Sequence, residues 1–230
     1  IPPMIVPARR DAPLPSVEVL ADTLTFHSFE IESAEGDMLD VKVLPDRAGY
    51  ALSHRGIAYE LSAMLHLPLT HDPLAKPLPV WKESAMLSIE TKSTYVRRHL
   101  GALVEGVKVG PSPAWLREAL ESVGQRSINN IVDASNYVML ATGQPSGVFD
   151  LGKIKKENGV ARITIREAQI GERITILTGE EYALSAGMYV IADATSGEAL
   201  DIAGIKGGRD SGVTFDTTDL FVSCGTYDPT

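Results

Sequence analysis

The sequence predicts an α+β fold, in which a small N-terminal α/β module precedes a larger mixed domain with helices first and a strand-rich second half. Segments with helical spacing of apolar residues occur mainly before Gly143, and short strands separated by Gly- and Ser-containing turns follow Gly159. Helices followed by a run of strands favour α+β over a doubly wound parallel sheet, in which the two kinds of element would alternate.

Proline-rich segments predict how the chain is divided. We expect residues 1–15 to be a tail or linker, residues 16–66 a small module, residues 67–85 a second linker, and residues 86–230 the larger domain. The second linker contains four prolines and almost no periodicity. Those prolines are Pro68, Pro73, Pro77 and Pro79.

In the module, a first helix is expected after Ser16, a good N-cap residue. A strand is expected over Met38–Leu44, where apolar and polar residues alternate. A second helix starts at Ser53 and is stopped by Pro68. Its apolar stripe is formed by Ile57, Ala58, Leu61, Met64 and Leu65.

In the larger domain, a strand is expected within Tyr95–Val109. Ser112 and Pro113 predict an N-cap and first helical residue, with Gly124 as the C′ residue that ends the helix. A further helix is expected within Ser127–Thr142. The strands expected after it are Val160–Arg166, Arg173–Leu177, Met188–Ala192, Ala199–Ile205 and Leu220–Cys224.

Charge and composition narrow the classes of function. Acidic residues outnumber basic ones 30 to 21, for a net charge of −9, which disfavours general nucleic-acid binding because phosphate neutralisation depends on Lys and Arg. No apolar run approaches the roughly 18 residues of a membrane span. The single cysteine, Cys224, excludes an internal disulfide framework, fits a reducing compartment such as the cytoplasm, and is expected to be a buried, inert thiol in a strand.

The common catalytic signatures are missing from the sequence. It contains neither a phosphate-binding loop ending in Gly-Lys-Ser/Thr nor a Gly-x-Ser-x-Gly elbow. The glycines of Gly204–Gly208 are read as a tight turn or a close backbone approach. His66 and His71 lack further ligands at zinc spacing, so no metal site is predicted.

Several segments, in order and at family spacing from about Pro15 to the C-terminus, resemble the beta subunit of bacterial phenylalanyl-tRNA synthetase, specifically its N-terminal module and central editing region. They are Asp40–Arg47, Leu52–Leu61, Gly106–Leu116, Ile128–Leu140, Gly143–Pro145, Phe149–Asp150, Val190–Asp193, Ala199–Gly208 and Ser211–Val213.

The resemblance implies a role in protein biosynthesis as part of a phenylalanine–tRNA ligase. The family is an (αβ)₂ heterotetramer in which the alpha subunit, not this chain, activates phenylalanine with ATP and Mg²⁺ and loads it onto tRNA(Phe). We therefore expect no cofactor on this chain, an alpha partner, tRNA contact through the holoenzyme, no membrane association, and a native product longer than these 230 residues.

The family's editing site hydrolyses tyrosine wrongly attached to tRNA(Phe). This second site is needed because an apolar pocket rejects an added hydroxyl by only about 10²-fold. By resemblance, the pocket shell comprises Ser135, Asn136, Gln144, Pro145, Phe149, Gly204, Gly207 and Gly208, with Gly147 and Ser223 at its two polar positions.

Those two polar positions depart from the family pattern. Gly147 stands where the family's Gly-Gln-Pro-Met-His-Ala-Phe-Asp motif has the editing histidine, and Ser223 stands where its Leu-Leu-Glu-Cys strand has the editing glutamate. Glycine cannot transfer a proton, and serine is an uncharged and weaker acceptor for a phenol. We therefore expect a degenerate pocket with absent or much weakened editing.

A third departure lies between Glu32 and Asp40, where many relatives insert a tRNA-binding barrel and this chain has only a few residues. Two other functions stay open. One is a free-standing hydrolase that clears mischarged tRNA. The other is a non-catalytic module that binds an aromatic amino acid through Asn136 and the Gly204–Gly208 turn.

Overall fold

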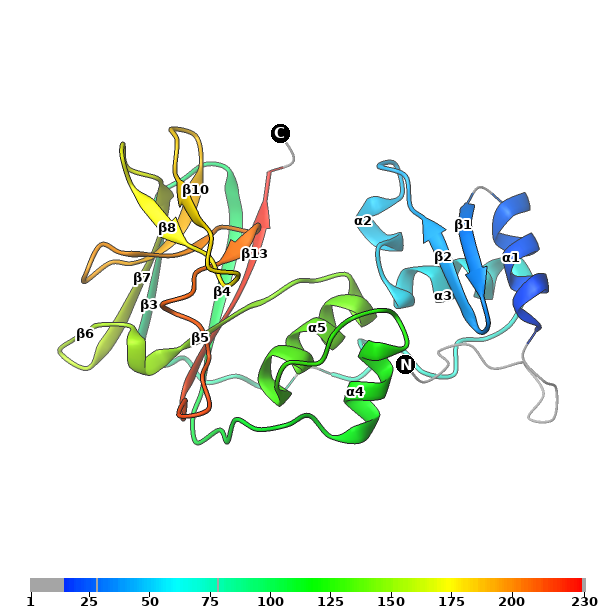
Figure 1. Cartoon of the computed structure of the whole chain (residues 1–230), viewed down its shortest axis with the longest axis horizontal. Coiled ribbons are helices and arrows are strands. Elements are labelled where there is room, and N and C mark those ends of the chain that lie inside the picture. Colours follow the sequence, from blue (N-terminus) through cyan, green and yellow to red (C-terminus); the bar gives the residue numbers. More distant parts are fainter. Residues whose placement is uncertain (1–14, 28, 78, 229–230) are drawn as a thin grey trace. The chain divides into compact units, whose positions relative to one another are not determined.

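The computed structural model describes residues 15–27, 29–77 and 79–228, so most of the expected tail at residues 1–15 lies outside it. Its helices and sheets confirm the α+β class (Figure 1). Contacts group the chain into two compact units that interleave along the sequence, and the domain boundaries expected above stay a prediction. Unit 1 comprises Ile1–Val80, Pro113–Ser127 and Asn136–Gln144, and unit 2 comprises Trp81–Ser112, Ile128–Ser135 and Pro145–Thr230.

The N-terminal part of unit 1 consists of a β-hairpin and three helices. Its first elements are α1 (Val17–Phe26), β1 (Glu30–Glu35), β2 (Met38–Lys42), α2 (Ala48–Ala51) and α3 (His54–Leu65). The predicted N-cap Ser16 is confirmed, because its hydroxyl accepts a hydrogen bond from the Val19 amide. Ser53, predicted as the start of a helix, caps α3 in the same way by accepting a hydrogen bond from the Gly56 amide. The buried core of this part consists of Leu24, Phe29, Ala51 and Leu61.

The segment between Glu32 and Asp40 closes the hairpin. β1 pairs antiparallel with β2, and Gly36 takes the left-handed backbone conformation (φ +58°) that a tight turn requires. β1 was not predicted, because its residues are largely polar. The few residues between Glu32 and Asp40, where the resemblance predicted that a barrel is missing, form a direct strand-to-strand turn.

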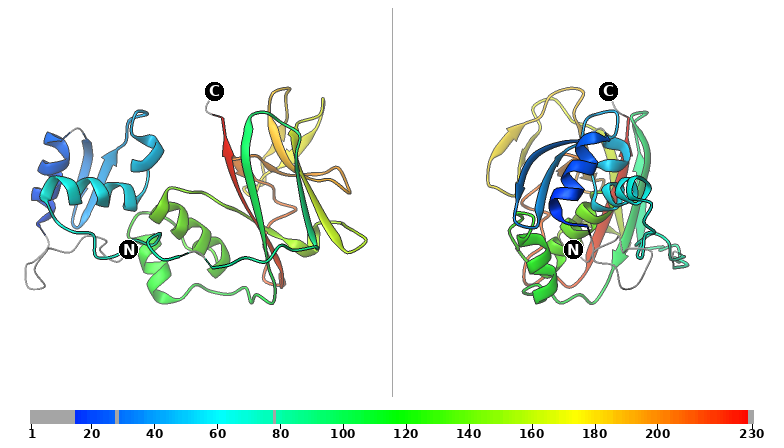
Figure 2. Two further views of the ribbon diagram at one scale, coloured as in Figure 1. Left: turned by 180° about the vertical axis from the view of Figure 1, so that it is seen from behind. Right: turned by 90° about the vertical axis from the view of Figure 1, so that its right-hand side faces the viewer.

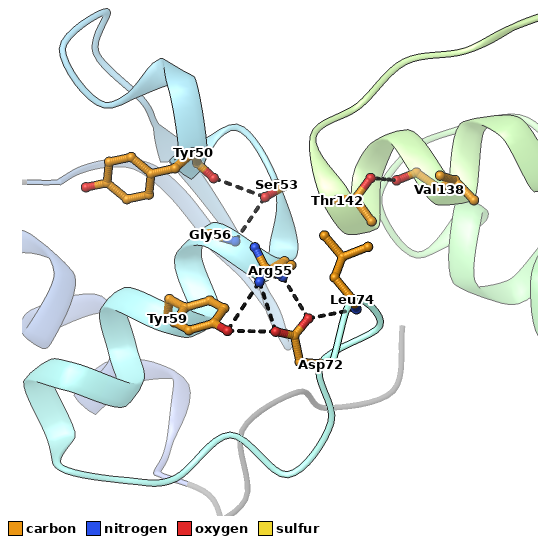
Figure 3. A network of polar contacts seen from close by, with 9 residues as sticks. All are labelled: Tyr50, Ser53, Arg55, Gly56, Tyr59, Asp72, Leu74, Val138 and Thr142. Atoms are coloured by element: carbon orange, nitrogen blue, oxygen red, sulfur yellow. Dashed lines mark hydrogen bonds and ion pairs between the residues drawn. The ribbon is translucent and has the colours of Figure 1, made fainter. Parts of the chain in front are cut away.

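A polar cluster fixes the chain that leaves α3 (Figure 3). The Arg55 guanidinium donates to both carboxylate oxygens of Asp72, at 2.7 and 2.9 Å. The Tyr59 hydroxyl donates to the same carboxylate at 2.6 Å, and the Leu74 amide donates to it at 2.9 Å. These donors, the Arg55 guanidinium first, hold the pKa of Asp72 well below its usual range.

The remaining helices, α4 (Ala114–Glu121) and α5 (Asn130–Thr142), correct the expected caps. Ser112 is not the N-cap of α4, because its hydroxyl donates to the buried carboxylate of Asp133, and Pro113 holds that position without a side-chain cap. Gly124 has a positive φ (+75°), but it lies two residues beyond the C-cap Ser122. α5 starts later than expected, where the Asn129 side chain accepts hydrogen bonds from two helix amides.

Unit 2 contains all the other strands. One sheet has the order β12–β11–β10–β7–β3, with β6 also pairing with β7. Its strands are β3 (Leu87–Thr91), β6 (Lys156–Glu157), β7 (Val160–Glu167), β10 (Tyr189–Asp193), β11 (Ala199–Ile202) and β12 (Lys206–Gly207). A second sheet has the order β4–β13–β5, formed by Val96–Val104, Leu220–Tyr227 and Gly147–Asp150. The short strands β8 (Arg173–Thr175) and β9 (Glu181–Ala183) form a separate hairpin.

The two larger sheets of unit 2 share one apolar core. Figure 2 shows the strands of both sheets from behind. From the second sheet, Phe149 and Phe221 enter this core, and from the first sheet Ile163, Ile165 and Ile191 do so. Because side chains two apart on a strand share a face, Ser223 and Gly225 lie on the same face of β13 as Phe221, the face toward this core. All five strands predicted after Gly159 are confirmed, whereas β3, β5, β6, β9 and β12 were not anticipated.

Candidate functional site

The inward face of the β4–β13–β5 sheet carries the candidate site. Ser223 on β13 pairs with Gly101 on β4 and with Gly147 on β5, so neither strand neighbour has a side chain. Two residues further along β13, Gly225 pairs with His99 of β4. Because side chains two apart on a strand share a face, Ser223, Gly225 and His99 lie on one side of the sheet.

His99 and Ser223 are joined across the sheet. The His99 Nε2 atom lies 2.8 Å from the Ser223 Oγ atom, and Ser223 is 2% exposed. The other ring nitrogen of His99, Nδ1, is buried without a hydrogen-bond partner among the described residues. Burial lowers the pKa of His99, which keeps the imidazole neutral at pH 7.

Aromatic rings pack against the glycines of this face. A Cβ at position 147 would lie 2.9 Å from Cε2 of Phe149, and one at position 101 would lie 2.7 Å from Cε2 of Phe221. Phe149 and Phe221 stack with their ring centroids 5.4 Å apart. Both rings therefore occupy space that side chains at positions 101 and 147 would need.

A third ring, that of Tyr227, covers Gly204 and Gly225. A Cβ at position 204 would lie 2.9 Å from Tyr227 Cε2, and one at position 225 would lie 2.6 Å from the Tyr227 hydroxyl oxygen. Gly204 has a positive φ (+74°), so its predicted tight turn is confirmed.

Three further groups have shifted pKa values: Asp201, Tyr227, and Cys224, whose side chain alternates to the opposite face of β13. Burial raises the pKa of the Asp201 carboxyl to about 7. Burial, and then the nearby charge of Asp201, raises the pKa of Tyr227 to about 12. Burial also raises the pKa of the Cys224 thiol; Cys224 lies in the predicted strand but is half-buried, not fully buried as expected. Perturbed titrations of this kind gather at functional sites, although packing alone also produces them.

The structure brings several of the expected pocket residues together within unit 2. Gly147, Phe149 and Ser223 meet on the sheet as described. The Ser135 hydroxyl donates to the Ser146 carbonyl at 2.9 Å, which holds the middle of α5 against the residue before Gly147.

The glycine turn has its own neighbours. Gly207 lies against Leu177 and Asp201, and a Cβ at Gly208 would lie 2.4 Å from the Leu200 carbonyl oxygen, which confirms the predicted close backbone approach. Asn136 and Gln144 group with unit 1, and Pro145 opens the segment of unit 2 that leads to β5. The candidate site therefore consists of residues of unit 2 that contact one another.

Sequence reasoning did not single out His99, Asp201 or Tyr227. The spacing along the strands could have indicated His99. His99 and Gly101 are two residues apart on a predicted strand, as are Ser223 and Gly225, so each pair shares one face of its strand. Among the described residues, no group of three or more His, Cys, Asp or Glu side chains could hold a metal ion. None of the described helices is both long and apolar enough to cross a membrane. What this face offers is a hydroxyl beside a neutral imidazole in an apolar surrounding.

Comparison with known proteins agrees with the family resemblance that the sequence motifs indicated. A family model described as the B3/4 domain matches residues 95–230. The phenylalanine–tRNA ligase beta subunit of Carboxydothermus hydrogenoformans is 39% identical over 84% of this chain and 23% of its own length. The beta subunit of Aquifex aeolicus is 38% identical over the same shares.

The chain thus spans about a quarter of the length of the curated relatives it matches. The resemblance inferred from the sequence motifs is confirmed. A solved N-terminal fragment of the phenylalanyl-tRNA synthetase beta subunit from Pyrococcus horikoshii overlaps with a TM-score of 0.47 and 16% identity, over 93% of this chain and 63% of that chain.

Proposed function

Because the chain belongs to the B3/4 domain family over residues 95–230, we propose that it acts as part of the beta subunit of a phenylalanine–tRNA ligase. Support comes from the 37–40% identity of the first five curated relatives, all beta subunits of that ligase. Its role is chiefly architectural and related to tRNA, and its editing pocket is degenerate.

The proposal includes the partners and the division of labour. An alpha subunit joins this chain in an (αβ)₂ assembly in the cytoplasm, binds ATP and Mg²⁺, and carries the aminoacylation site. tRNA(Phe) reaches this chain through the assembled ligase. This division is consistent with the acidic balance of the chain, because a net charge of −9 opposes contacts with phosphates.

The main support for a degenerate pocket is the register in which β13 pairs with β5. The two positions that are polar in the family are directly paired here as Ser223 and Gly147. The Phe149 ring lies where a side chain at position 147 would begin, and the Ser223 hydroxyl is already bonded to His99. A pocket that has lost a carboxylate and an imidazole at these positions has lost its means of binding the tyrosine hydroxyl and of moving a proton.

The test is hydrolysis of tyrosyl-tRNA(Phe) by the complete ligase that contains this chain. We expect a rate close to that of the uncatalysed reaction. The variant that combines Gly147→His with Ser223→Glu should gain hydrolysis if Phe149 can shift by the few tenths of an ångström that the new Cβ needs. Rapid, tyrosine-selective hydrolysis by the unmodified ligase would contradict the proposal.

The same assay separates the two other functions. A free-standing hydrolase would deacylate tyrosyl-tRNA(Phe) as the isolated 230-residue chain, without an alpha subunit. A module for aromatic amino acids would bind free Phe or Tyr in calorimetry. The filled face around Gly147 and Gly225 disfavours both, since Phe149 and Tyr227 already cover those glycines.

A further inference from the structure

We propose that Asn158, in the turn between β6 and β7 (Figure 1), is a site of spontaneous deamidation whose product frees β6 from its pairing with β7. The reaction converts the side-chain amide into a carboxylate, either as aspartate or as isoaspartate, in which the backbone runs through the former side chain. This inference uses no residue of the candidate site and does not depend on the proposed function.

The sequence distinguishes Asn158 from the other asparagines by the residue that follows it. Asparagine stands at positions 129, 130, 136 and 158, and glycine follows only the last of these. Deamidation begins when the backbone nitrogen of the next residue attacks the side-chain amide carbon, so a side chain on that residue hinders the approach. Gly159 has no Cβ and leaves the approach open.

The structure restrains the other three asparagines. The Asn129 side chain accepts hydrogen bonds from two amides of α5, and the Asn130 side chain is hydrogen-bonded through both its oxygen and its nitrogen. Asn136 lies inside α5, where the helical hydrogen bonds fix the amide of the next residue. Asn158 is exposed, and its side chain forms no hydrogen bond among the described residues.

The turn itself controls how fast the reaction proceeds. Glu157 pairs with Val160, so Asn158 and Gly159 form a two-residue loop. Both have positive φ, +51° and +80°, which identifies a type I′ turn. In this turn the Gly159 nitrogen points away from the Asn158 side chain, and the Asn158 backbone must rotate before attack. We therefore expect the folded chain to react during local opening of the turn, more slowly than the unfolded chain.

The reaction balances without a further reactant other than water. The Gly159 nitrogen bonds to the side-chain amide carbon of Asn158, and the amino group leaves with the Gly159 proton as ammonia. Water then adds to one of the two carbonyl carbons of the cyclic imide, the bond from that carbon to the nitrogen breaks, and the nitrogen recovers a proton. Opening at the side-chain carbonyl gives aspartate, and opening at the backbone carbonyl gives isoaspartate. The net change is amide plus water to carboxylic acid plus ammonia.

Isoaspartate lengthens the backbone of the turn by one carbon. The length of a hairpin turn sets the register of its strands, so the pairing of β6 cannot persist unchanged. β6 is only Lys156–Glu157, and its one strand partner among the described residues is β7. β7 also pairs with β3 and β10, so the change should stay local. Either product also adds a negative charge beside the exposed Lys155 and Lys156.

The experiment incubates the full 230-residue chain at pH 8 in water labelled with heavy oxygen, both folded and in urea. Peptide mass spectrometry then locates the label. We expect it at Asn158 well before Asn129, Asn130 and Asn136, partly as isoaspartate, and about tenfold more slowly in the folded chain than in urea, the effect of a small free energy of local opening.

The state of β6 is measured on the same samples by hydrogen exchange. After incubation, the amides of Lys156 and Glu157 should exchange faster in the wild type. Asn158→Gly is the matched control, because Gly-Gly favours the same turn but has no side-chain amide to lose. The incubated Asn158→Gly variant should therefore keep the exchange rates of the fresh protein.

Each contrary result overturns a stated part of the proposal. Label that enters Asn158 no faster than the other three asparagines overturns the site. Isoaspartate at position 158 with unchanged exchange in β6 overturns the release of that strand, as does an equal rise in the incubated Asn158→Gly variant. None of these results affects hydrolysis of tyrosyl-tRNA(Phe), so the proposed function stands or fails separately.

Discussion

At the scale of the residue, glycines determine what the inward face of β13 can contain. Gly101 and Gly147 pair with Ser223, and aromatic rings approach both of them more closely than a Cβ would allow. The stacked Phe149 and Phe221 rings add apolar contact and exclude water from the serine. The hydroxyl of Ser223 thus has a local environment that a larger neighbour at either glycine would remove.

Asp201 gives a prediction about pH. Its folded-state pKa of about 7 lies above the ordinary value of 3.8, so the folded chain holds this proton more tightly than the unfolded chain does. The wild type therefore loses stability as the pH rises from about 4 to about 7. Asp201→Asn, which cannot ionise, should raise the melting temperature little at pH 4 and most at pH 7 and above.

Thermal unfolding of both proteins at pH 4, 5.5 and 8 measures this difference, with Asp216→Asn as the control because Asp216 is exposed. A stabilisation by Asp201→Asn of the same size at every pH would contradict the assignment of the buried proton.

At the scale of the element, the cluster of Arg55, Tyr59 and Asp72 joins α3 to the segment that follows it. Asp72→Ala removes the acceptor for the Leu74 amide and for both side-chain donors. We expect the Leu74 amide to exchange its hydrogen roughly tenfold faster, the effect of losing ~1.4 kcal/mol of local stabilisation.

Hydrogen exchange followed by mass spectrometry measures the change at residues 67–77. Asp46→Ala is the control, because the Asp46 side chain is 71% exposed and pairs with Arg47 only at 3.9 Å. Equal exchange in the two variants would mean that the cluster does not hold this segment.

The helices and long strands could be predicted because their signals are local. Ser16 and Ser53 cap their helices through hydrogen bonds within three residues, and the alternation in Leu220–Cys224 lies within one strand. β5 could not be predicted, because it begins with glycine and exists through its pairing with β13. Ser112 was misassigned because its partner, Asp133, is 21 residues away.

The site divides in the same way. Gly147 and Ser223 were singled out from the sequence because, by the resemblance, each replaces a residue within a motif of the family. His99 was not found, because its bond to Ser223 joins residues 124 apart in sequence and nothing near His99 in the chain reports it. Asp201 and Tyr227 were missed for the same reason: their shifted pKa values arise from burial between sheets, which no short pattern encodes.

At the scale of the whole molecule, the charge balance bears on the proposed contact with tRNA. The net charge is −9, and several cations are already paired, among them Arg55 with Asp72 and Arg166 with Glu172. Lys155 and Lys156 are among the exposed cations that form no ion pair within the described residues, but the excess of carboxylates opposes the approach of phosphates to them. The net charge of an isolated chain of this kind therefore disfavours tight binding of tRNA.

We therefore expect the isolated chain to bind tRNA(Phe) with a Kd weaker than about 10⁻⁴ M at roughly 0.15 M salt, the weak limit of non-specific binding. On the proposed function, the complete ligase should bind far more tightly, because its further parts would supply the phosphate contacts. Reversing the charge of Lys155 and Lys156 to Glu should leave the affinity of the complete ligase unchanged. Micromolar binding by the isolated chain with a steep salt dependence would instead place a tRNA contact on these residues, and electrophoretic mobility shifts over a salt series distinguish the two results.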